Sequence, residues 1–201
     1  MTRDETIAKA VHAALKLAET DKWERLTLSA IADEAGLELK VFHGLADKDD
    51  ISAAVERVFD AGMSAETVDA EETARTRLFD VIMLRFETME AVRDGAMSFL
   101  RWRDRSFDGL ALRLKARAST ARWALACAGL DGERRVPRGV QLAALGWAIA
   151  QAERAWRQET SADLTRTMAA LDAELIKIEE RMTWLNKRGK SSVTPADAEA
   201  D

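Results

Sequence analysis

The sequence predicts an all-α protein of about nine helices, arranged as a small N-terminal head and a larger helical body. The chain has 201 residues, 47% of them hydrophobic and 32% charged, a balance typical of a globular protein. It has two prolines, no tyrosine and many Ala, Leu, Glu, Arg and Met residues, a composition that favours helix. β-Branched residues are scattered and form no alternating run, so no strand is expected.

Four helices are expected in the head, residues 1–62. The first, from about residue 4 to residue 19, has apolar residues at helical spacing on one stripe. A short helix over residues 27–35 ends before Gly36, because glycine adopts the positive φ of a helix C-terminus without steric strain. A second short helix is expected over residues 38–44, and a longer one over residues 48–62.

The body is expected over residues 63–190, followed by a disordered tail over residues 191–201. A wide apolar stripe predicts a helix near residues 77–89, and two further helices precede a loop. This loop, residues 129–139, contains glycines and Pro137.

The last two helices have the most regular pattern in the chain. Apolar residues alternate three and four positions apart, first from Leu142 to Trp156 and then from Leu164 to Leu185. This period is typical of a coiled-coil-like seam, and the short connection makes the two helices antiparallel. The seam has more apolar surface than one helix pair buries, which predicts a homodimer joined by a four-helix bundle. The residues expected at the dimer interface are Leu145, Ile149, Trp156, Met168, Leu171, Leu175, Ile178 and Met182.

A short helix, a glycine turn and a second short helix, held between longer helices, make the layout of a helix-turn-helix unit. Residues 7–59 of this chain resemble the head of the TetR family of one-component transcriptional regulators. The residues that carry the resemblance are Thr27, Ile31, Ala32, Ala35, Gly36, Leu37, Phe42, His43 and Lys48.

The resemblance implies binding of double-stranded DNA. Thr27 and Lys48 match family positions that touch DNA phosphates, and residues 38–44 match the recognition helix that enters the major groove. The residues expected to contact DNA are Thr27, Glu38, Leu39, Lys40, Phe42, His43 and Lys48.

The head also departs from the family pattern. Glu38 replaces a usual Ser or Thr, His43 replaces a usual Tyr, and the segment between Gly36 and Lys48 is one residue short. His43 is expected either to contact DNA or to be a partly buried ring that replaces the aromatic one.

The charge of the head is a further departure. Residues 1–60 have eight Lys and Arg against thirteen Asp and Glu, whereas the rest of the chain has 22 of each sign. The net charge of −5 therefore lies in the head. Because affinity for DNA depends on cations at phosphates, the head either keeps a local basic face or is a structural relic.

Two stretches of the body, residues 77–86 and 163–172, are similar to a subgroup of this family. That subgroup is in turn similar to the ubiquinone-biosynthesis lipid-binding proteins, which share the TetR-like fold but do not act as repressors. The analogy implies a pocket for a small hydrophobic ligand, although large apolar residues at helical spacing also form ordinary cores. The expected pocket residues are Met83, Phe86, Met89, Phe99, Trp102 and Trp123.

Two functions are therefore expected as alternatives. The first is a TetR-like one-component transcriptional regulator that binds DNA as a homodimer and senses a small hydrophobic ligand. The second is a lipid-binding accessory protein of TetR-like fold with a degenerate head. Its C-terminal helix would lie on an anionic membrane surface through Trp184, Lys187, Arg188 and Lys190.

No enzyme is expected, because the sequence has no Gly-rich phosphate loop and no Ser/His/Asp or Cys/His constellation. The two histidines are far apart, so neither a metal nor a cofactor is expected. The lone Cys127 and the lack of a secretory signal predict a cytoplasmic protein. The basic run of Arg101, Arg103 and Arg105 is expected on a solvated helix face, with an acidic ligand or a membrane surface as the alternative partner.

Overall fold

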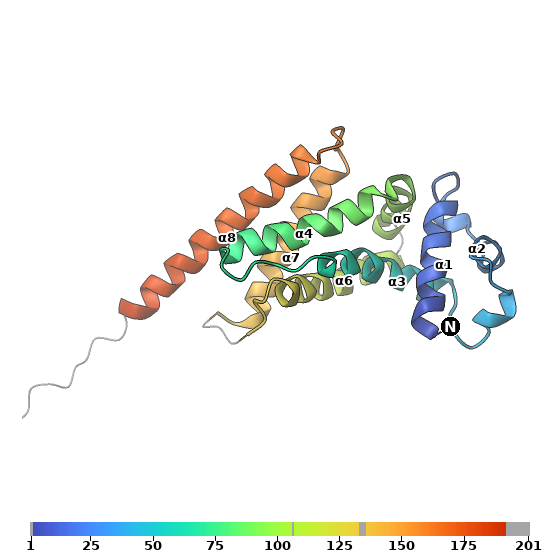
Figure 1. Ribbon diagram of the computed structural model, residues 1–201, viewed down its shortest axis with the longest axis horizontal. Helices are drawn as coiled ribbons and strands as arrows, with labels where there is room; N and C mark the ends of the chain where they lie inside the picture. Colours follow the sequence, from blue (N-terminus) through green and yellow to red (C-terminus); the bar gives the residue numbers. More distant parts are fainter. Residues whose placement is uncertain (1, 106, 133–135, 192–201) are drawn as a thin grey trace, which may run out of the picture.

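Helices make up the whole regular structure of the described chain, as the sequence predicts (Figure 1). The computed structural model describes residues 2–105, 107–132 and 136–191. Within these ranges there are eight α-helices and three short 3₁₀ helices, labelled η, and no strand. They are α1 Arg3–Leu17, η1 Trp23–Arg25, α2 Leu28–Glu34, η2 Leu39–Phe42, α3 Lys48–Ala61, η3 Gly62–Ser64, α4 Ala74–Glu90, α5 Arg93–Arg105, α6 Phe107–Cys127, α7 Arg138–Trp156 and α8 Thr165–Ser191.

The head consists of α1, α2, η2 and α3, and each of its α-helices begins at a capping side chain. Thr2 and Asp47 form capping boxes with Glu5 and Asp50 at the starts of α1 and α3. Thr27 begins α2, because its hydroxyl accepts a hydrogen bond from a backbone N–H of the first turn at 3.2 Å. Local sequence therefore fixes where these three helices start.

The segment after α2 differs from the expected second short helix. Gly36 has a φ of 65° and ends α2 as expected, but η2 is a single 3₁₀ turn of four residues. Gly44 then has a φ of 70°, so a left-handed glycine closes the segment on each side. The helix expected over residues 38–44 is thus present but shorter than expected, a 3₁₀ turn over residues 39–42.

The head packs tightly on the body where α1 contacts α5. A Cβ at Gly95 of α5 would lie 2.1 Å from the carbonyl oxygen of Leu15 in α1, so this crossing requires glycine. Nearby, the fully buried Trp23 packs edge-on against Phe99, with ring centroids 4.9 Å apart, and its indole N–H donates to Ser52 at 3.1 Å. Head and body share one continuous apolar core.

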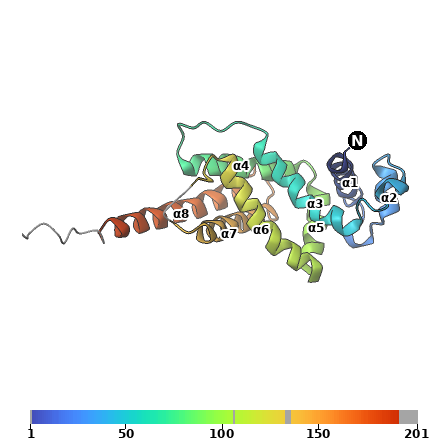
Figure 2. The same ribbon diagram turned by 90° about the horizontal axis from the view of Figure 1, so that it is seen from below.

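The last two helices, α7 and α8, pack against each other as an antiparallel pair, and the C-terminal turns of α8 project beyond the rest of the body in both views (Figures 1 and 2). None of the described helices is long and apolar enough to cross a membrane. The disordered tail expected over residues 191–201 lies, from residue 192 onward, outside the described residues.

Candidate DNA-facing head and ligand pocket

The residues expected to contact DNA lie around α2, η2 and the start of α3, and most of them are exposed. Phe42 is an exception, because it is only 2% exposed and belongs to the apolar core. His43 is exposed, so its ring does not fill the core in place of an aromatic residue. The other exposed residues of the expected set are Thr27, Glu38, Leu39 and Lys40.

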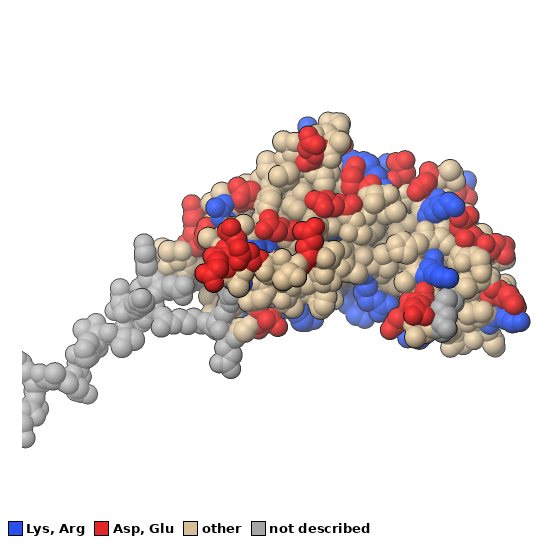
Figure 3. Space-filling view, viewed as in Figure 1, with Lys and Arg blue, Asp and Glu red and all other residues tan. Residues whose placement is uncertain are grey.

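Both lysines of this surface interact with the chain itself. Lys40 Nζ lies 2.5 Å from Glu38 Oε2, and Lys48 Nζ donates to the backbone carbonyl of Glu24 at 3.0 Å. Burial lowers the pKa of Lys48. Acidic side chains also cover parts of the head on the face shown in Figure 3. A DNA phosphate would therefore compete with partners already in place, although the exposed pair of Lys40 and Glu38 is weak.

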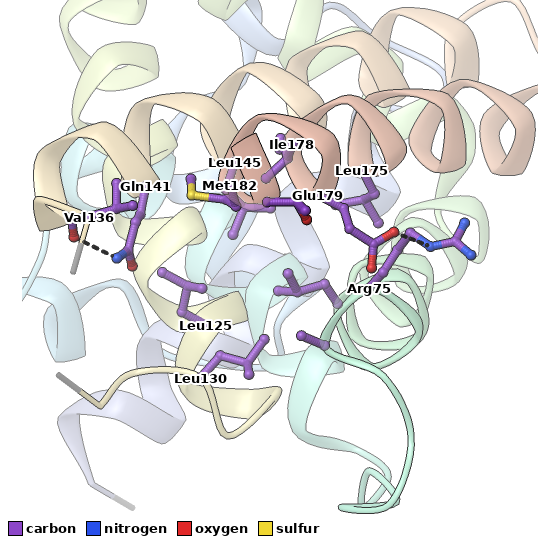
Figure 4. Close-up of a pocket in the computed structure, with 13 residues that line it drawn as sticks. Arg75, Leu125, Leu130, Val136, Gln141, Leu145, Leu175, Ile178, Glu179 and Met182 are labelled. Carbon is purple, nitrogen blue, oxygen red and sulfur yellow. Dashed lines mark hydrogen bonds and ion pairs between the residues drawn. The ribbon is translucent and has the colours of Figure 1, made fainter. Parts of the chain in front are cut away.

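A pocket of about 400 Å³ opens in the body between α4, α6, α7 and α8 (Figure 4). Its volume falls in the usual range for small-molecule sites. Most of its wall is apolar. Of the labelled polar side chains, Gln141 lies toward one end and Arg75 and Glu179 lie toward the other. The lining residues are Ala74, Arg75, Leu78, Leu125, Leu130, Val136, Gln141, Leu145, Leu175, Ile178, Glu179, Met182 and Thr183.

None of the six expected pocket residues lines this pocket. Four of them, at most 7% exposed, pack in the core instead: Met83, Phe86, Met89 and Phe99. Trp102 is half-buried beside Trp23, where it lines a separate shallow groove at the junction of head and body. Trp123 is 43% exposed, and its indole N–H donates to the Asp60 carbonyl at 3.0 Å. The apolar stripe of α4 faces the core, and the structure does not bring these six residues together.

The expected dimer residues divide into three groups. Trp156, Ile149 and Leu171 are at most 1% exposed, so they pack within their own chain. Leu145, Leu175, Ile178 and Met182 line the pocket. Met168, at 40%, is exposed. The regular seam therefore packs α7 against α8 and lines the pocket. The sequence pattern alone did not distinguish these two roles from a contact between two chains.

Several large apolar side chains of α7 and α8 are exposed. They are Val140 and Trp147 on α7 and Met168, Ile176 and Trp184 on α8, with exposed fractions between 37% and 60%. Where such side chains form one contiguous patch, they commonly mark an interaction site.

Buried charges connect α3 of the head with α4, α5 and α7 of the body. Glu56 of α3 accepts hydrogen bonds from Arg85 of α4, at 2.5 Å, and from Arg103 of α5. Arg103 also donates to Glu153 of α7 at 2.7 Å. Asp60, one turn after Glu56, accepts from Arg85 at 2.8 Å. All five side chains are 10% exposed or less. We call Glu56, Asp60, Arg85, Arg103 and Glu153 the buried charge network.

The place of Arg103 corrects the expectation of a solvated basic run. Alternate residues of an α-helix lie about 200° apart around its axis. Arg103 therefore faces the core, whereas Arg101 and Arg105 on the opposite side are exposed.

Two carboxylates of the buried charge network, Glu153 and Asp60, have pKa values shifted in opposite directions. Burial opposes ionisation of Glu153, but Arg103, Arg117 and Arg157 outweigh it and lower its pKa to about 2. Burial raises the pKa of Asp60, and Arg85 only partly offsets that effect. The Glu153 carboxylate is therefore the firmly charged centre of the network.

The architecture is that of a helical protein with a helix-turn-helix head on a pocket-bearing body. No protein-family model matches the chain, and no curated protein matches it. A solved TetR transcriptional regulator from Nitrosomonas europaea is similar in structure, with a TM-score of 0.68 at 18% identity over 86% of this chain and 96% of that one. A TetR transcriptional regulator from Rhodococcus has a TM-score of 0.59 at 15% identity over 85% and 94%. The chain therefore has the fold of the TetR transcriptional regulators.

Proposed function

We propose that this chain is a one-component transcriptional regulator of the TetR type, which binds double-stranded DNA as a homodimer and senses a small hydrophobic ligand in its body. The observation that carries the proposal is the double role of α3. Its N-terminus presents Lys48 beside the helix-turn-helix surface, and its last two turns place Glu56 and Asp60 in the buried charge network.

A route from the pocket to the head supports this function. Leu145 of α7 lines the pocket, and Glu153 lies about two turns further along the same helix. Glu153 and Glu56 share the guanidinium of Arg103, which connects α7 to α3. A ligand that displaces α7 acts on the orientation of α3 through this connection. In a dimer, such a displacement changes the population of molecules whose two heads are spaced for adjacent major grooves.

The exposed apolar side chains of α7 and α8 supply the dimer surface in this proposal. Trp147 of α7 is 60% exposed and lines a groove beside Leu114 and Arg117 of α6. Ile176 and Trp184 are exposed on α8. A four-helix bundle with a second copy would cover them. The buried seam residues Ile149, Trp156 and Leu171 support this surface from beneath.

The test is binding to a labelled duplex from the region upstream of the protein's own gene, titrated across salt. We expect selective binding over a shuffled duplex of the same length, and an affinity that falls steeply as salt rises. Absence of binding at low salt, with no competitor present, would contradict DNA recognition.

The head favours a second candidate, a lipid-binding accessory protein that does not read DNA. Its supporting observation is η2, a single turn that begins at the anionic Glu38 and whose Lys40 is paired with that residue. The membrane surface expected for this candidate involves Lys187, Arg188 and Lys190, whose side chains lie outside the described residues. Native mass spectrometry of the purified protein and flotation with anionic liposomes test it. Absence of co-purified lipid in the mass spectra, together with absence of binding to the liposomes, would count against this candidate.

A further inference from the structure

The pocket between α4, α6, α7 and α8 has a definite distribution of polarity (Figure 4). Leu125, Leu130, Leu145, Leu175 and Ile178 lie along its middle, and all five are apolar. A polar pair lies toward each end in the close-up: Gln141 with the Val136 backbone, and Arg75 with Glu179.

The polar side chains at both ends already interact with other groups of the chain. The Gln141 amide N–H donates to the Val136 carbonyl at 2.8 Å. Arg75 donates to Asp172 of α8 at 2.8 Å. Its Nε lies 3.3 Å from the carboxylate of Glu179, two turns further along the same face of α8, as an ion pair without a hydrogen bond. One guanidinium of α4 is thus held between two carboxylates of α8. We call Arg75, Asp172 and Glu179 the mouth clamp.

The charge balance of the mouth clamp disfavours ionised ligands. An anionic ligand would compete with Asp172 and Glu179 for Arg75 and would meet their like charges. A cationic ligand would have to displace Arg75 from its carboxylates. Beyond the clamp, the described wall has no charged side chain that would offset the desolvation of a ligand charge.

We propose that the pocket takes a neutral, elongated apolar molecule with at most one uncharged polar end, such as a hydroxyl or a carbonyl. This inference rests on the proposed ligand-sensing function and adds the chemical class of the ligand. The amide of Gln141 and the hydroxyl of Thr183 are the uncharged groups of the lining that suit such an end. We expect the clamp to weaken the binding of fatty acids and alkyl ammonium ions of the same length, with water screening part of the effect because its side chains are between 36% and 54% exposed.

The test compares three probes that share one chain: 1-decanol, decanoate and decyltrimethylammonium, each at concentrations where it stays monomeric. Binding to the full-length protein is measured by isothermal titration calorimetry and native mass spectrometry. We expect decanol to bind at least tenfold more tightly than either ion. Equal binding of decanoate or of the ammonium ion would overturn the neutral class alone. Binding of none of the three would overturn the neutral class and the proposed ligand pocket together.

Filling the pocket locates the site. Leu78 is half-buried in the pocket wall, so Leu78→Trp places an indole in the cavity, and we expect decanol affinity to fall at least tenfold. Leu114→Trp is the matched control, because Leu114 is 67% exposed on α6 and does not line the pocket. Met182→Trp is a second filling variant in case Leu78→Trp fails to fold. Unchanged decanol binding in a folded filling variant would place the probe elsewhere and overturn the proposal.

The mouth clamp also allows a gain of binding. In the double variant Asp172→Asn with Glu179→Gln, Arg75 loses both carboxylate partners and becomes free to pair with a ligand anion. We expect decanoate affinity to rise at least tenfold, while decanol affinity stays within about twofold. Glu180→Gln is the control, since Glu180 is an exposed neighbour on α8 outside the lining. No gain for decanoate in the folded double variant would show that the clamp does not set the charge selectivity.

Discussion

Arg103 of α5 and Glu153 of α7 form a fully buried ion pair, with 2.7 Å between the nitrogen and the oxygen and 1% and 4% of the two side chains exposed. Glu153 also contacts Arg117 at 3.2 Å and Arg157 at 2.8 Å, and Arg103 also contacts Glu56. A buried charge that loses its partner is strongly destabilising, even where the intact pair adds little net stability. We therefore expect the intact network to specify which helices meet more than it adds to net stability.

Glu153→Gln should lower the free energy of unfolding by about 3–5 kcal/mol, because three arginines lose their common anion in a dry environment. Urea denaturation followed by circular dichroism measures the change. Arg154→Gln is the control on the same helix, since Arg154 is exposed, and it should change stability by no more than about 0.5 kcal/mol. A loss in Glu153→Gln no larger than in this control would contradict the assigned role of the carboxylate.

The same carboxylate predicts a pH dependence. Folding lowers the pKa of Glu153 from 4.5 to about 2. Between these two pH values the unfolded chain binds a proton at Glu153 that the folded chain does not. The stability from ionised Glu153 is therefore fully present above about pH 4.5 and is lost as the pH falls toward 2. The stability difference between wild type and Glu153→Gln should shrink as the pH falls from 6 to 3 in urea titrations. The raised pKa of Asp60 acts in the opposite direction, but it is common to both proteins. A difference that stays constant over this range would refute the prediction.

Gly95→Ala tests the crossing of α1 and α5. The new Cβ would lie 2.1 Å from the Leu15 carbonyl oxygen, a backbone atom that cannot rotate away, so the helices must separate. We expect a loss of about 1–3 kcal/mol by thermal or urea denaturation. Gly139→Ala, in the first turn of α7, is a matched control with open space around the position, and it should be neutral or slightly stabilising. Equal effects of the two substitutions would mean that the crossing tolerates a side chain.

The sequence predicted the helices and the helix-turn-helix layout because these depend on local signals. Thr27 and Asp47 cap helices through neighbouring backbone groups, and Gly36 adopts the left-handed turn where expected. The length of η2 was missed, because it depends on how the segment between Gly36 and Gly44 closes against the head core through Phe42. Periodicity alone carries no such information.

The pocket was misplaced for a similar reason. Leu145 and Ile178 have the same apolar spacing as Ile149 and Leu171, yet the first two line a cavity and the last two are core. Only the packing of α4 and α6 against α7 and α8 distinguishes the pocket residues from the core residues. A signal for the buried charge network was present, since Arg85 lies in the apolar stripe of α4, three residues after Ile82 and four before Met89. A charged residue in such a stripe needs a buried partner, but the sequence does not say which one.

Trp147→Arg should abolish the proposed dimer. The indole is 60% exposed on α7, and a charge there would be buried without a partner if a second copy covers this surface. Multi-angle light scattering at micromolar concentration should give the dimer mass for wild type and the monomer mass for the variant. Phe107→Arg serves as a control for replacing an exposed aromatic, since Phe107 is 88% exposed at the start of α6. A wild-type monomer, or a variant that stays dimeric, would exclude this surface.

Glu38→Thr tests whether the head keeps its affinity for DNA. The substitution removes an anion that faces the phosphates in the proposed complex and frees Lys40, whose Nζ lies 2.5 Å from the Glu38 carboxylate. Each additional phosphate contact steepens the salt dependence of log affinity by about 0.9 for B-form DNA, so the slope should steepen by about one unit as Lys40 engages. We expect affinity for a duplex of random sequence, measured by fluorescence anisotropy at low salt, to rise about tenfold. Glu87→Gln, an exposed carboxylate on α4 of the body, controls for net charge alone. If both variants gain equally, the effect comes from the overall charge of the protein, and η2 does not lie against the phosphates.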